Sequence, residues 1–216
     1  MYVAQIMSRP VDTVTADLKL SQVAKLMRDK GRRFLPVVDG DGRLVGLVSH
    51  RELERAEPSS ITTLSVGEVN YLMAKVKVAQ VMRAQVISCG PDTLVEEAGQ
   101  LMRDRRIGCL PVVEGERLVG IITDDDILDF LLDITGCHLK DTTRIAVHLA
   151  DRTGELAKLL TAVNRQGGYI ATVVSPVVPD ATGMRVAILR YRADDPAELD
   201  RQLQREGFDL MTEHLP

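Results

Sequence analysis

The tetrapeptide LPVV stands at residues 35–38 and returns at residues 110–113, 75 positions later. Two further segments repeat at the same offset: VAQIM at residues 3–7 returns as VAQVM at residues 78–82, and LMRD at residues 26–29 returns unchanged at residues 101–104. Chance does not keep one register over so much sequence, so the chain contains an internal duplication. Two copies are too few for a solenoid, which needs three or more stacked repeats. We therefore expect a pseudo-symmetric pair with the functional site between the copies.

Each copy predicts the element order β-α-β-β-α from its hydrophobic periodicity and its turn residues. In the first copy we expect a strand at 11–15, a helix from about Asp17 to Gly31, hairpin strands at 35–38 and 43–48, and a helix from Ser49. In the second copy we expect a strand at 86–89, a helix stripe from Leu94 to Met102, a hairpin over 110–122, and a helix at 125–134. That last helix has more apolar side chains than one face needs, which predicts a contact with another domain or subunit.

The pattern changes near Arg144, where strands and helices follow in the order β-α-β-β-α-β, with strands at 144–150, 169–178, 184–192 and 208–212. This is the split arrangement of ferredoxin-like folds. The expected fold class is α/β (α+β), with two duplicated units and a smaller third domain. We place the boundaries as follows: first unit 1–56, linker and connecting helix 57–77, second unit 78–134, linker 135–143, and C-terminal domain 144–216.

The composition narrows the class of protein. A net charge of −4 and an aromatic content of 3% argue against binding to nucleic acid or to an anionic membrane surface. The chain has no run of about 18 apolar residues and no leader-like N-terminus, so we expect a cytoplasmic protein. Its three cysteines and four histidines show no metal-ligand, redox-pair or nucleophile–base spacing. We therefore expect neither a metal site nor catalysis.

Two short motifs follow strand endings at equivalent places in the copies, Ser49-x-x-Glu52 and Thr123-x-x-Asp126. Each is typical of a capping box, in which the hydroxyl accepts a hydrogen bond from a backbone N–H three residues on and the acid binds back to the cap. Such a cap stabilises a helix by about 1 kcal/mol. Taken singly, each motif has this structural interpretation.

The first 134 residues resemble a tandem pair of CBS domains, a Bateman module. The resemblance depends on both LPVV segments, on the Gly46 and Gly120 strands, and on Thr123-x-x-Asp126. It implies an adenosyl ligand of the AMP, ATP, NAD or S-adenosylmethionine class between the units. The acid would hold the ribose hydroxyls, the Ser or Thr would face the phosphates, and apolar residues would sandwich the adenine. The implied binding residues are Thr123, Asp126, Ser49, Glu52, Arg33, Val11, Leu35, Pro36, Val86, Leu110 and Pro111.

The two copies differ in ways that affect such a ligand. Glu52 carries its carboxylate one methylene further out than Asp126 does. Near the first motif, Arg33 and other basic residues are candidates for phosphate, whereas Asp124 and Asp125 would repel a polyphosphate near the second. The two sites need not share a ligand. Capping and ligand binding are also compatible, because the same acid can either cap the helix or bind the ligand.

The third domain resembles an ACT domain, because residues 151–156 (DRTGEL) follow a strand and lead into a helix. The resemblance implies amino-acid binding at Asp151, Gly154, Glu155 and Leu156. Many members have Asn where this chain has Tyr169, so dimerisation or coupling is favoured over amino-acid binding. Two CBS units followed by an ACT domain are similar to the bacterial AcuB family of acetoin utilisation proteins.

These observations favour a non-catalytic regulatory sensor that binds an adenosyl ligand and transmits its occupancy to the ACT domain or to an unidentified protein target. We expect a homodimer, with no catalytic cofactor. Three alternatives stay open: an enzyme, a constitutive dimerisation scaffold, and an amino-acid sensor that works through the ACT domain.

Overall fold

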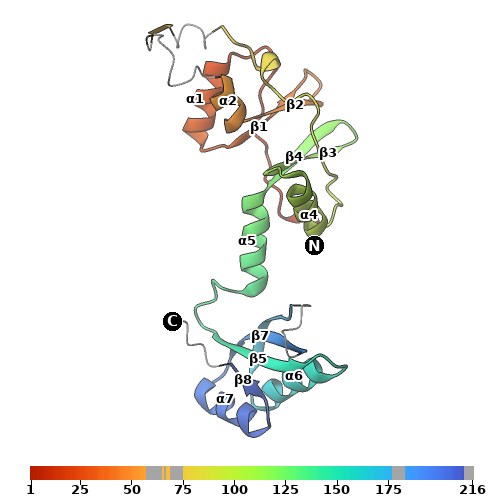
Figure 1. Ribbon diagram of the computed structural model, residues 1–216, viewed down its shortest axis with the longest axis vertical. Coiled ribbons are helices and arrows are strands. Elements are labelled where there is room, and N and C mark those ends of the chain that lie inside the picture. Colours follow the sequence, from red (N-terminus) through yellow and green to blue (C-terminus); the bar gives the residue numbers. More distant parts are fainter. Residues whose placement is uncertain (57–64, 66, 69–74, 177–182, 212–216) are drawn as a thin grey trace. The chain divides into compact units, whose positions relative to one another are not determined.

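The computed structural model describes residues 1–56, 65, 67–68, 75–176 and 183–211 (Figure 1). By its internal contacts the chain divides into two compact units, Met1–Leu128 and Asp129–Pro216. Among the described residues, no helix is both long enough and apolar enough to span a bilayer. The duplicated part of the sequence lies almost wholly in the first unit.

The elements of the first unit follow the predicted repeat. They are η1 (Val3–Gln5), α1 (Leu20–Lys30), β1 (Phe34–Val38), β2 (Leu44–Ser49), α2 (His50–Ala56), η2 (Val78–Gln80), α4 (Val95–Arg105), β3 (Cys109–Glu114), β4 (Arg117–Thr123) and the first turns of α5 (Asp124–Thr135). In α1 the buried residues Leu20, Val23 and Met27 recur at helical spacing. The helix ends at Gly31, whose φ of 62° suits a residue without a side chain.

The predicted first strand of each copy is wrong in extent. Only Val14 pairs with Val37, and only Cys89 pairs with Val112, each as a single parallel bridge. The chain leaves the sheet on both sides of the bridge, so the apolar pattern marks a buried extended segment rather than a full strand. The predicted start of α1 at Asp17 also moves, because Lys19 is the N-cap.

Part of the predicted connection lies outside the described residues. This applies to the expected surface segment 57–63 and to residues 66 and 69–74 of the expected connecting helix 66–77. Residues 75–77 are described and are not helical, because Lys77 instead bridges to Lys19 ahead of η2.

The two hairpins show the duplication in their hydrogen bonding. β1 pairs with β2 and β3 pairs with β4, both antiparallel, and each pair has a register shift at the same place, after Val37 and after Val112. The hairpins also bond to each other, because Leu44 N–H donates to the Glu116 carbonyl and Leu118 N–H donates to the Gly42 carbonyl. The copies therefore meet at their hairpin ends as a pair.

Each copy contributes its first turn to the hydrophobic core of the other. Val3 and Met7 are buried with the second-copy residues Leu110 and Ile122, while Val78 is buried in the first-copy core. This exchange explains why both copies have a glycine at the equivalent position, Gly46 in the first and Gly120 in the second. A Cβ on Gly120 would lie 2.3 Å from the sulfur of Met7, and one on Gly46 would lie 2.6 Å from that of Met82.

The second unit has the predicted order β-α-β-β-α-β. Its elements are β5 (Thr143–Ala150), α6 (Glu155–Arg165), β6 (Tyr169–Val174), β7 (Met184–Arg192), α7 (Pro196–Arg205) and β8 (Asp209–Leu210). The sheet is antiparallel in the order β6-β7-β5-β8. β6 and β8 are shorter than expected, and residues 177–182 and 212 of the predicted turn and strands lie outside the described part.

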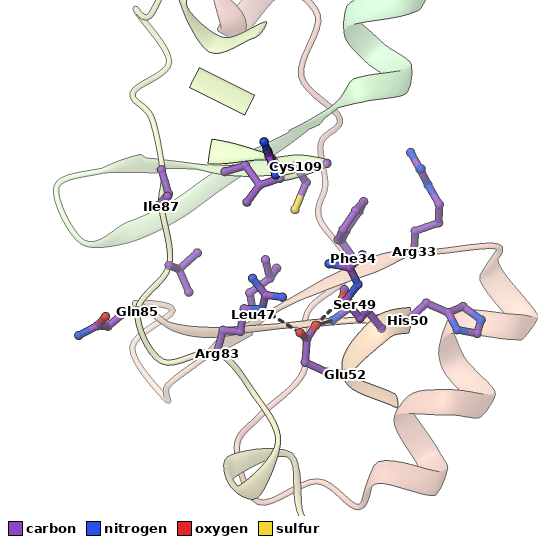
Figure 2. Close-up of a pocket in the computed structure, with 15 residues that line it drawn as sticks. Arg33, Phe34, Leu47, Ser49, His50, Glu52, Arg83, Gln85, Ile87 and Cys109 are labelled. Atoms are coloured by element: carbon purple, nitrogen blue, oxygen red, sulfur yellow. Dashed lines mark hydrogen bonds and ion pairs between the residues drawn. The ribbon is translucent and has the colours of Figure 1, made fainter. Parts of the chain in front are cut away.

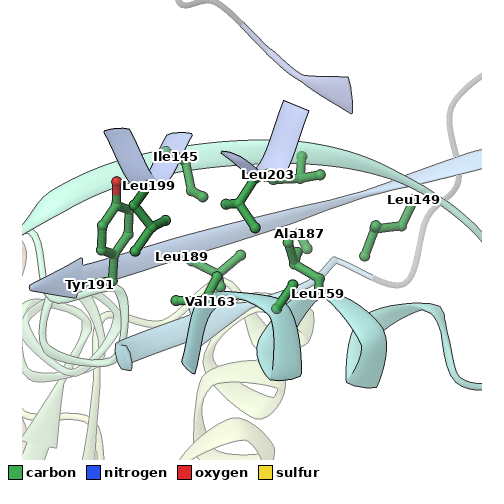
Figure 3. Packing of buried hydrophobic residues seen from close by; sticks show 11 residues of the cluster. Ile145, Leu149, Leu159, Val163, Ala187, Leu189, Tyr191, Leu199 and Leu203 are labelled. Carbon is green, nitrogen blue, oxygen red and sulfur yellow. The ribbon is translucent and has the colours of Figure 1, made fainter. Parts of the chain in front are cut away.

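The core of the second unit lies between the sheet and its two helices (Figure 3). Leu159 of α6 and Leu203 of α7 are fully buried against Leu189 of β7. Tyr191 is also fully buried, and its hydroxyl donates to Asp200 at 2.6 Å, so the polar end of the ring has a partner. Burial raises the pKa of Tyr191, and the bond to Asp200 adds to this shift.

Candidate functional site

Two cavities between the repeats of the first unit are lined by residues of the two motifs. The larger one, here cavity A, has a volume of about 320 Å³ (Figure 2). Its lining comes from both copies: Arg33, Phe34, Leu47, Ser49, His50, Arg51 and Glu52 from the first, and Arg83, Gln85, Val86, Ile87, Arg106, Ile107, Gly108 and Cys109 from the second. This volume falls within the range of roughly 300–1,000 Å³ typical of small-molecule sites.

The smaller cavity, here cavity B, has a volume of about 230 Å³. It is lined by Ser8, Pro10, Val11, Asp12, Gly31, Arg32, Arg33 and Phe34 of the first copy, and by Ile121, Thr123, Asp125 and Asp126 of the second. The two cavities are equivalent under the repeat. In each one, the motif acid of one copy faces the predicted apolar residue of the other: Glu52 with Val86 in cavity A, and Asp126 with Val11 in cavity B.

Glu52 is a buried carboxylate in cavity A, and both of its oxygens are engaged. Ser49 N–H donates to Oε2 at 3.1 Å, the Ser49 hydroxyl donates to the same oxygen, and Arg83 Nε donates to Oε1 at 2.7 Å. Burial would raise the pKa of Glu52, but the hydrogen bonds from Ser49 and Arg83 outweigh it and hold this pKa below its ordinary value. Glu52 is therefore an anion whose charge is already compensated.

Asp126 in cavity B has one engaged oxygen and one open oxygen. The Thr123 N–H and hydroxyl both donate to Oδ2 at 2.7 Å. Across the described ranges of the chain, Oδ1 has no hydrogen-bond partner. The difference from Glu52 follows from the repeat, because the position equivalent to Arg83 is Ser8, which carries no charge. Asp126 can thus accept a hydroxyl while it still caps α5.

The capping interpretation is confirmed for Thr123 and Asp126, because the Asp126 N–H donates to the Thr123 hydroxyl at 3.4 Å and the Asp126 carboxylate accepts from the Thr123 N–H. At Ser49 and Glu52 the structure shows the carboxylate half of the box, in which the Ser49 N–H donates to Glu52. A cap does not by itself identify a site. A third box of the same form occurs at Ser65 and Glu68, where the Ser65 N–H and hydroxyl each donate to the Glu68 carboxylate at 2.8 Å. Neither residue lines cavity A or cavity B. What sets the other two motifs apart is the cavity that their acids line.

Arg33 is shared between the two cavities. Its guanidinium donates to Asp125 at 2.8 Å and also to Asp124, and these contacts raise its pKa, chiefly through the hydrogen bond to Asp124. In Figure 2 its side chain extends away from the carboxylate of Glu52. The position equivalent to Arg33 in the second copy is Gly108, and Arg33 is the one arginine that lines both cavity A and cavity B.

The cavities differ in charge. Cavity A is lined by four arginines and one glutamate, whereas cavity B is lined by two arginines and three aspartates. Within the part of the chain that the structure describes, Arg51 and Arg106 make no ion pair, so their charges are available in cavity A. In cavity B, Asp12 is paired with Arg32 at 3.0 Å and with Lys30. Cavity A therefore favours an anionic group and cavity B does not.

Four of the predicted apolar lining residues lie elsewhere. Leu35 and Leu110 are fully buried in the two cores, and Pro36 and Pro111 are also buried without lining either cavity. Phe34 and Cys109, one position earlier in each strand, line the cavities instead. Successive residues of a strand point to opposite faces of the sheet. A shift of one position therefore moves a side chain from the core to the cavity.

Sequence reasoning also missed Phe34 as the aromatic wall that both cavities share. Its ring packs on Gly108, where an added Cβ would lie 2.9 Å from the ring. The sequence does contain a signal for it. Residues 33–34 (RF) of the first copy correspond to residues 108–109 (GC) of the second, so the two copies differ just before LPVV. Cys109, also in cavity A, is a poor nucleophile because burial raises its pKa to about 12.

The predicted amino-acid site of the second unit forms a separate cavity. Asp151, Gly154 and Leu156 line it together with Arg185, whose guanidinium lies 3.3 Å from Asp151. Glu155 does not line it and instead pairs with Lys158 at 2.8 Å. Gly154 has a φ of 91° at the start of α6, a conformation that favours glycine. No group of three potential metal ligands occurs among the described residues.

A CBS-domain family model matches residues 3–59 and 78–133, which together are more than half of the 216 residues. A CBS domain-containing protein of Dictyostelium discoideum is 32% identical over 133 residues, or 61% of this chain and 92% of that protein. The inosine-5′-monophosphate dehydrogenase of Methanocaldococcus jannaschii is 33% identical over 125 residues, but these make up only 22% of the enzyme. The likeness to that enzyme is thus confined to a small part of it.

Three of the solved structures that resemble this chain each cover between 61% and 65% of it. A structure titled as the acetoin utilization protein AcuB of Vibrio cholerae is 30% identical with a TM-score of 0.54, covering 65% of this chain and 96% of that one. The CBS domain pair of protein MJ0100, in complex with 5′-methylthioadenosine and S-adenosyl-L-methionine, is 26% identical with a TM-score of 0.51, covering 61% and 95%. CBSX2 in complex with AMP is 25% identical with a TM-score of 0.53, covering 62% and 97%.

Proposed function

This chain belongs to the CBS-domain family, and we propose that it is a regulatory protein that binds adenosyl ligands between its two CBS units. The observation that carries the proposal is the open Oδ1 of Asp126 in a cavity that both repeats line. CBS-domain proteins are in general regulatory, although some relatives are enzymes with a CBS module. Neighbouring structures hold AMP, 5′-methylthioadenosine or S-adenosylmethionine, which supports the adenosyl class.

In cavity B, Asp126 is the proposed ribose ligand. An ionised carboxylate only accepts hydrogen bonds and suits the two hydroxyls of a ribose. Each charge-assisted bond of this kind contributes roughly 1.5–3 kcal/mol. Val11 and Phe34 supply apolar walls for the adenine. The acidic lining of this cavity favours an uncharged or cationic adenosyl compound over a polyphosphate.

In cavity A, we propose that an adenine nucleotide binds with its phosphate toward Arg51 and Arg106. These two arginines are exposed and unpaired among the described residues. Apolar contacts would come from Val86, Ile87 and Ile107. Glu52 has fewer open acceptor positions than Asp126, because Arg83 and Ser49 already bind it. Ribose recognition therefore contributes less here, and phosphate recognition contributes more.

The element proposed to transmit occupancy is α5. Its N-terminus is capped by the Thr123–Asp126 pair that lines cavity B. At its other end, the Thr135 carbonyl accepts hydrogen bonds from Arg190 at 3.1 Å and from Thr172 at 3.4 Å, both in strands of the second unit. A ligand that alters the Asp126 cap thus acts on a helix whose last residue is bonded to the C-terminal sheet.

We further propose that the C-terminal unit is an ACT-like domain. The β-α-β-β-α-β order and the cavity at Asp151 and Gly154 support this assignment. An amino-acid sensor is the second candidate function. The observation that favours it is the Arg185 guanidinium, which lies beside Asp151 and could pair with the carboxylate of a ligand. Stabilisation of the full chain by free amino acids, lost in Arg185→Gln, would establish that function.

The test of the adenosyl proposal is calorimetry of the full chain with AMP, ATP, NAD and S-adenosylmethionine. We expect at least one to bind, and we expect Asp126→Asn to weaken the ligand of cavity B about tenfold or more, as the loss of one charge-assisted bond implies. The matched control is Glu68→Gln, which alters an equivalent capping box that lines neither cavity. If no compound binds, or if both variants act alike, the motifs serve only as caps.

A further inference from the structure

Arg33 stands where the two proposed ligand sites meet. It lines cavity A and cavity B, and its guanidinium is paired with Asp125, which lines cavity B, and with Asp124, which lines neither cavity. Nearly half of the Arg33 side chain is exposed, at 47%. Exposed ion pairs of this kind contribute little and are readily exchanged. The position of the Arg33 charge is therefore sensitive to what each cavity contains.

The occupants that the two cavities favour make opposite demands on this arginine. An anionic phosphate in cavity A gains from an additional cation, and Arg33 is the one lining arginine of that cavity that is paired with an acid of the neighbouring cavity, Asp125. A cationic adenosyl compound in cavity B gains when Asp125 is released from its counter-ion. Both demands are met when Arg33 turns from cavity B to cavity A.

We propose that Arg33 couples the two cavities, so that an anionic nucleotide in cavity A and a cationic adenosyl compound in cavity B each strengthen the binding of the other. The inference rests on the proposed adenosyl-binding function and adds a regulatory relationship between its two sites. The coupling is reciprocal, because each ligand must change the affinity of the other by the same factor. The coupling is positive for one anionic and one cationic ligand, whereas two anionic ligands would compete for the same guanidinium.

The experiment is calorimetric titration of the full chain with AMP, alone and with saturating S-adenosylmethionine, and the reverse titration. We expect each compound to tighten the other about fivefold, the low end of measured allosteric coupling. The factor should fall toward one at high salt, because the Arg33 pairs are exposed and are screened. 5′-Methylthioadenosine, which lacks the sulfonium charge, should give a smaller factor than S-adenosylmethionine.

Three variants separate this arrangement from a general effect on folding. Arg33→Gln should weaken AMP and bring the coupling factor to about one, because the shared cation is gone. The double variant Asp124→Asn/Asp125→Asn should tighten AMP and also abolish the coupling, since Arg33 is then free at all times. Arg43→Gln is the matched control, because Arg43 lines neither cavity A nor cavity B and makes an exposed ion pair with Glu116; it should leave the factor unchanged.

Binding of both compounds with affinities independent of each other, or their mutual exclusion, would overturn the coupling while leaving the adenosyl-binding function intact. Equal loss of coupling in Arg43→Gln and Arg33→Gln would also overturn it. If neither compound binds, the proposed function fails and the coupling fails with it.

Discussion

Arg83 and Glu52 form an ion pair between the two CBS copies, with Nε 2.7 Å from Oε1, and the repeat does not reproduce this pair. At the equivalent place, Ser8 stands where Arg83 would be and Asp126 where Glu52 would be. In cavity A the acid Glu52 is thus paired with an arginine, whereas in cavity B the acid Asp126 has one oxygen that is open to a ligand. This asymmetry between otherwise repeated sites is the basis for assigning them different ligands.

Replacing Arg83 with the residue of the other copy tests this asymmetry. In Arg83→Ser, the buried Glu52 keeps only its bonds from Ser49, and we expect the free energy of unfolding to fall by about 1–2 kcal/mol, because a buried acceptor loses a charged donor. Urea unfolding measures the change. Arg43→Ser removes an exposed ion pair at 3.6 Å and should change stability by much less. Equal effects of the two variants would contradict the role of the Arg83 pair.

The pH dependence of stability should report on Glu52. Its folded pKa lies below the ordinary value of 4.5, so its contribution to stability is fully present above the unfolded pKa and is lost as the pH falls through the folded pKa. We therefore expect the stability difference between the wild type and Glu52→Gln to shrink as the pH is lowered from neutral to about 3. A difference that does not depend on pH would show that Glu52 acts through packing alone.

The exchange of first turns predicts a large penalty for filling the space beside Gly120. In Gly120→Ala, the new methyl group meets the sulfur of Met7 at 2.3 Å, and we expect a loss of about 1–3 kcal/mol from overpacking. Gly40→Ala is the control, because nothing lies within 4 Å of a Cβ there and its φ lies outside the left-handed region that favours glycine. Part of the loss should be recovered in Gly120→Ala/Met7→Ala. No recovery would contradict the packing of the N-terminal turn against the second copy.

The exposed apolar residues of α5 lead to a prediction about assembly. In the single chain no residue of α5 is buried, and Leu128 is 52% and Leu131 49% exposed. The homodimer expected from the sequence should cover these side chains. We expect Leu131→Glu to lower the molecular mass measured by sedimentation, whereas Leu44→Glu, in a hairpin strand, should not dissociate a dimer held by α5. A monomeric wild-type chain would exclude this assembly.

Much of the architecture could be predicted from the sequence. The duplication, the two hairpins, the helix ending at Gly31 and the β-α-β-β-α-β order of the second unit all follow from local periodicity and turn residues. Asp126, Glu52, Val11 and Val86, which line the two cavities, are among the residues that the sequence and its family resemblance indicate. These positions are recognisable because the repeat displays each motif twice in the same register.

The pairing across the copies was decided by the tertiary structure. The exchange of η1 and η2 places each acid opposite the apolar residue of the other copy and makes Phe34 a wall, while Leu35 and Leu110 enter the cores. It also brings Arg33 to Asp124 and Asp125, about ninety residues away in sequence. Local patterns indicate which faces are apolar, but contacts between distant segments depend on how those faces pack. The sequence alone therefore determined the repeated unit and its candidate acids, and the packing of the two copies determined which residues share a cavity and with what charge.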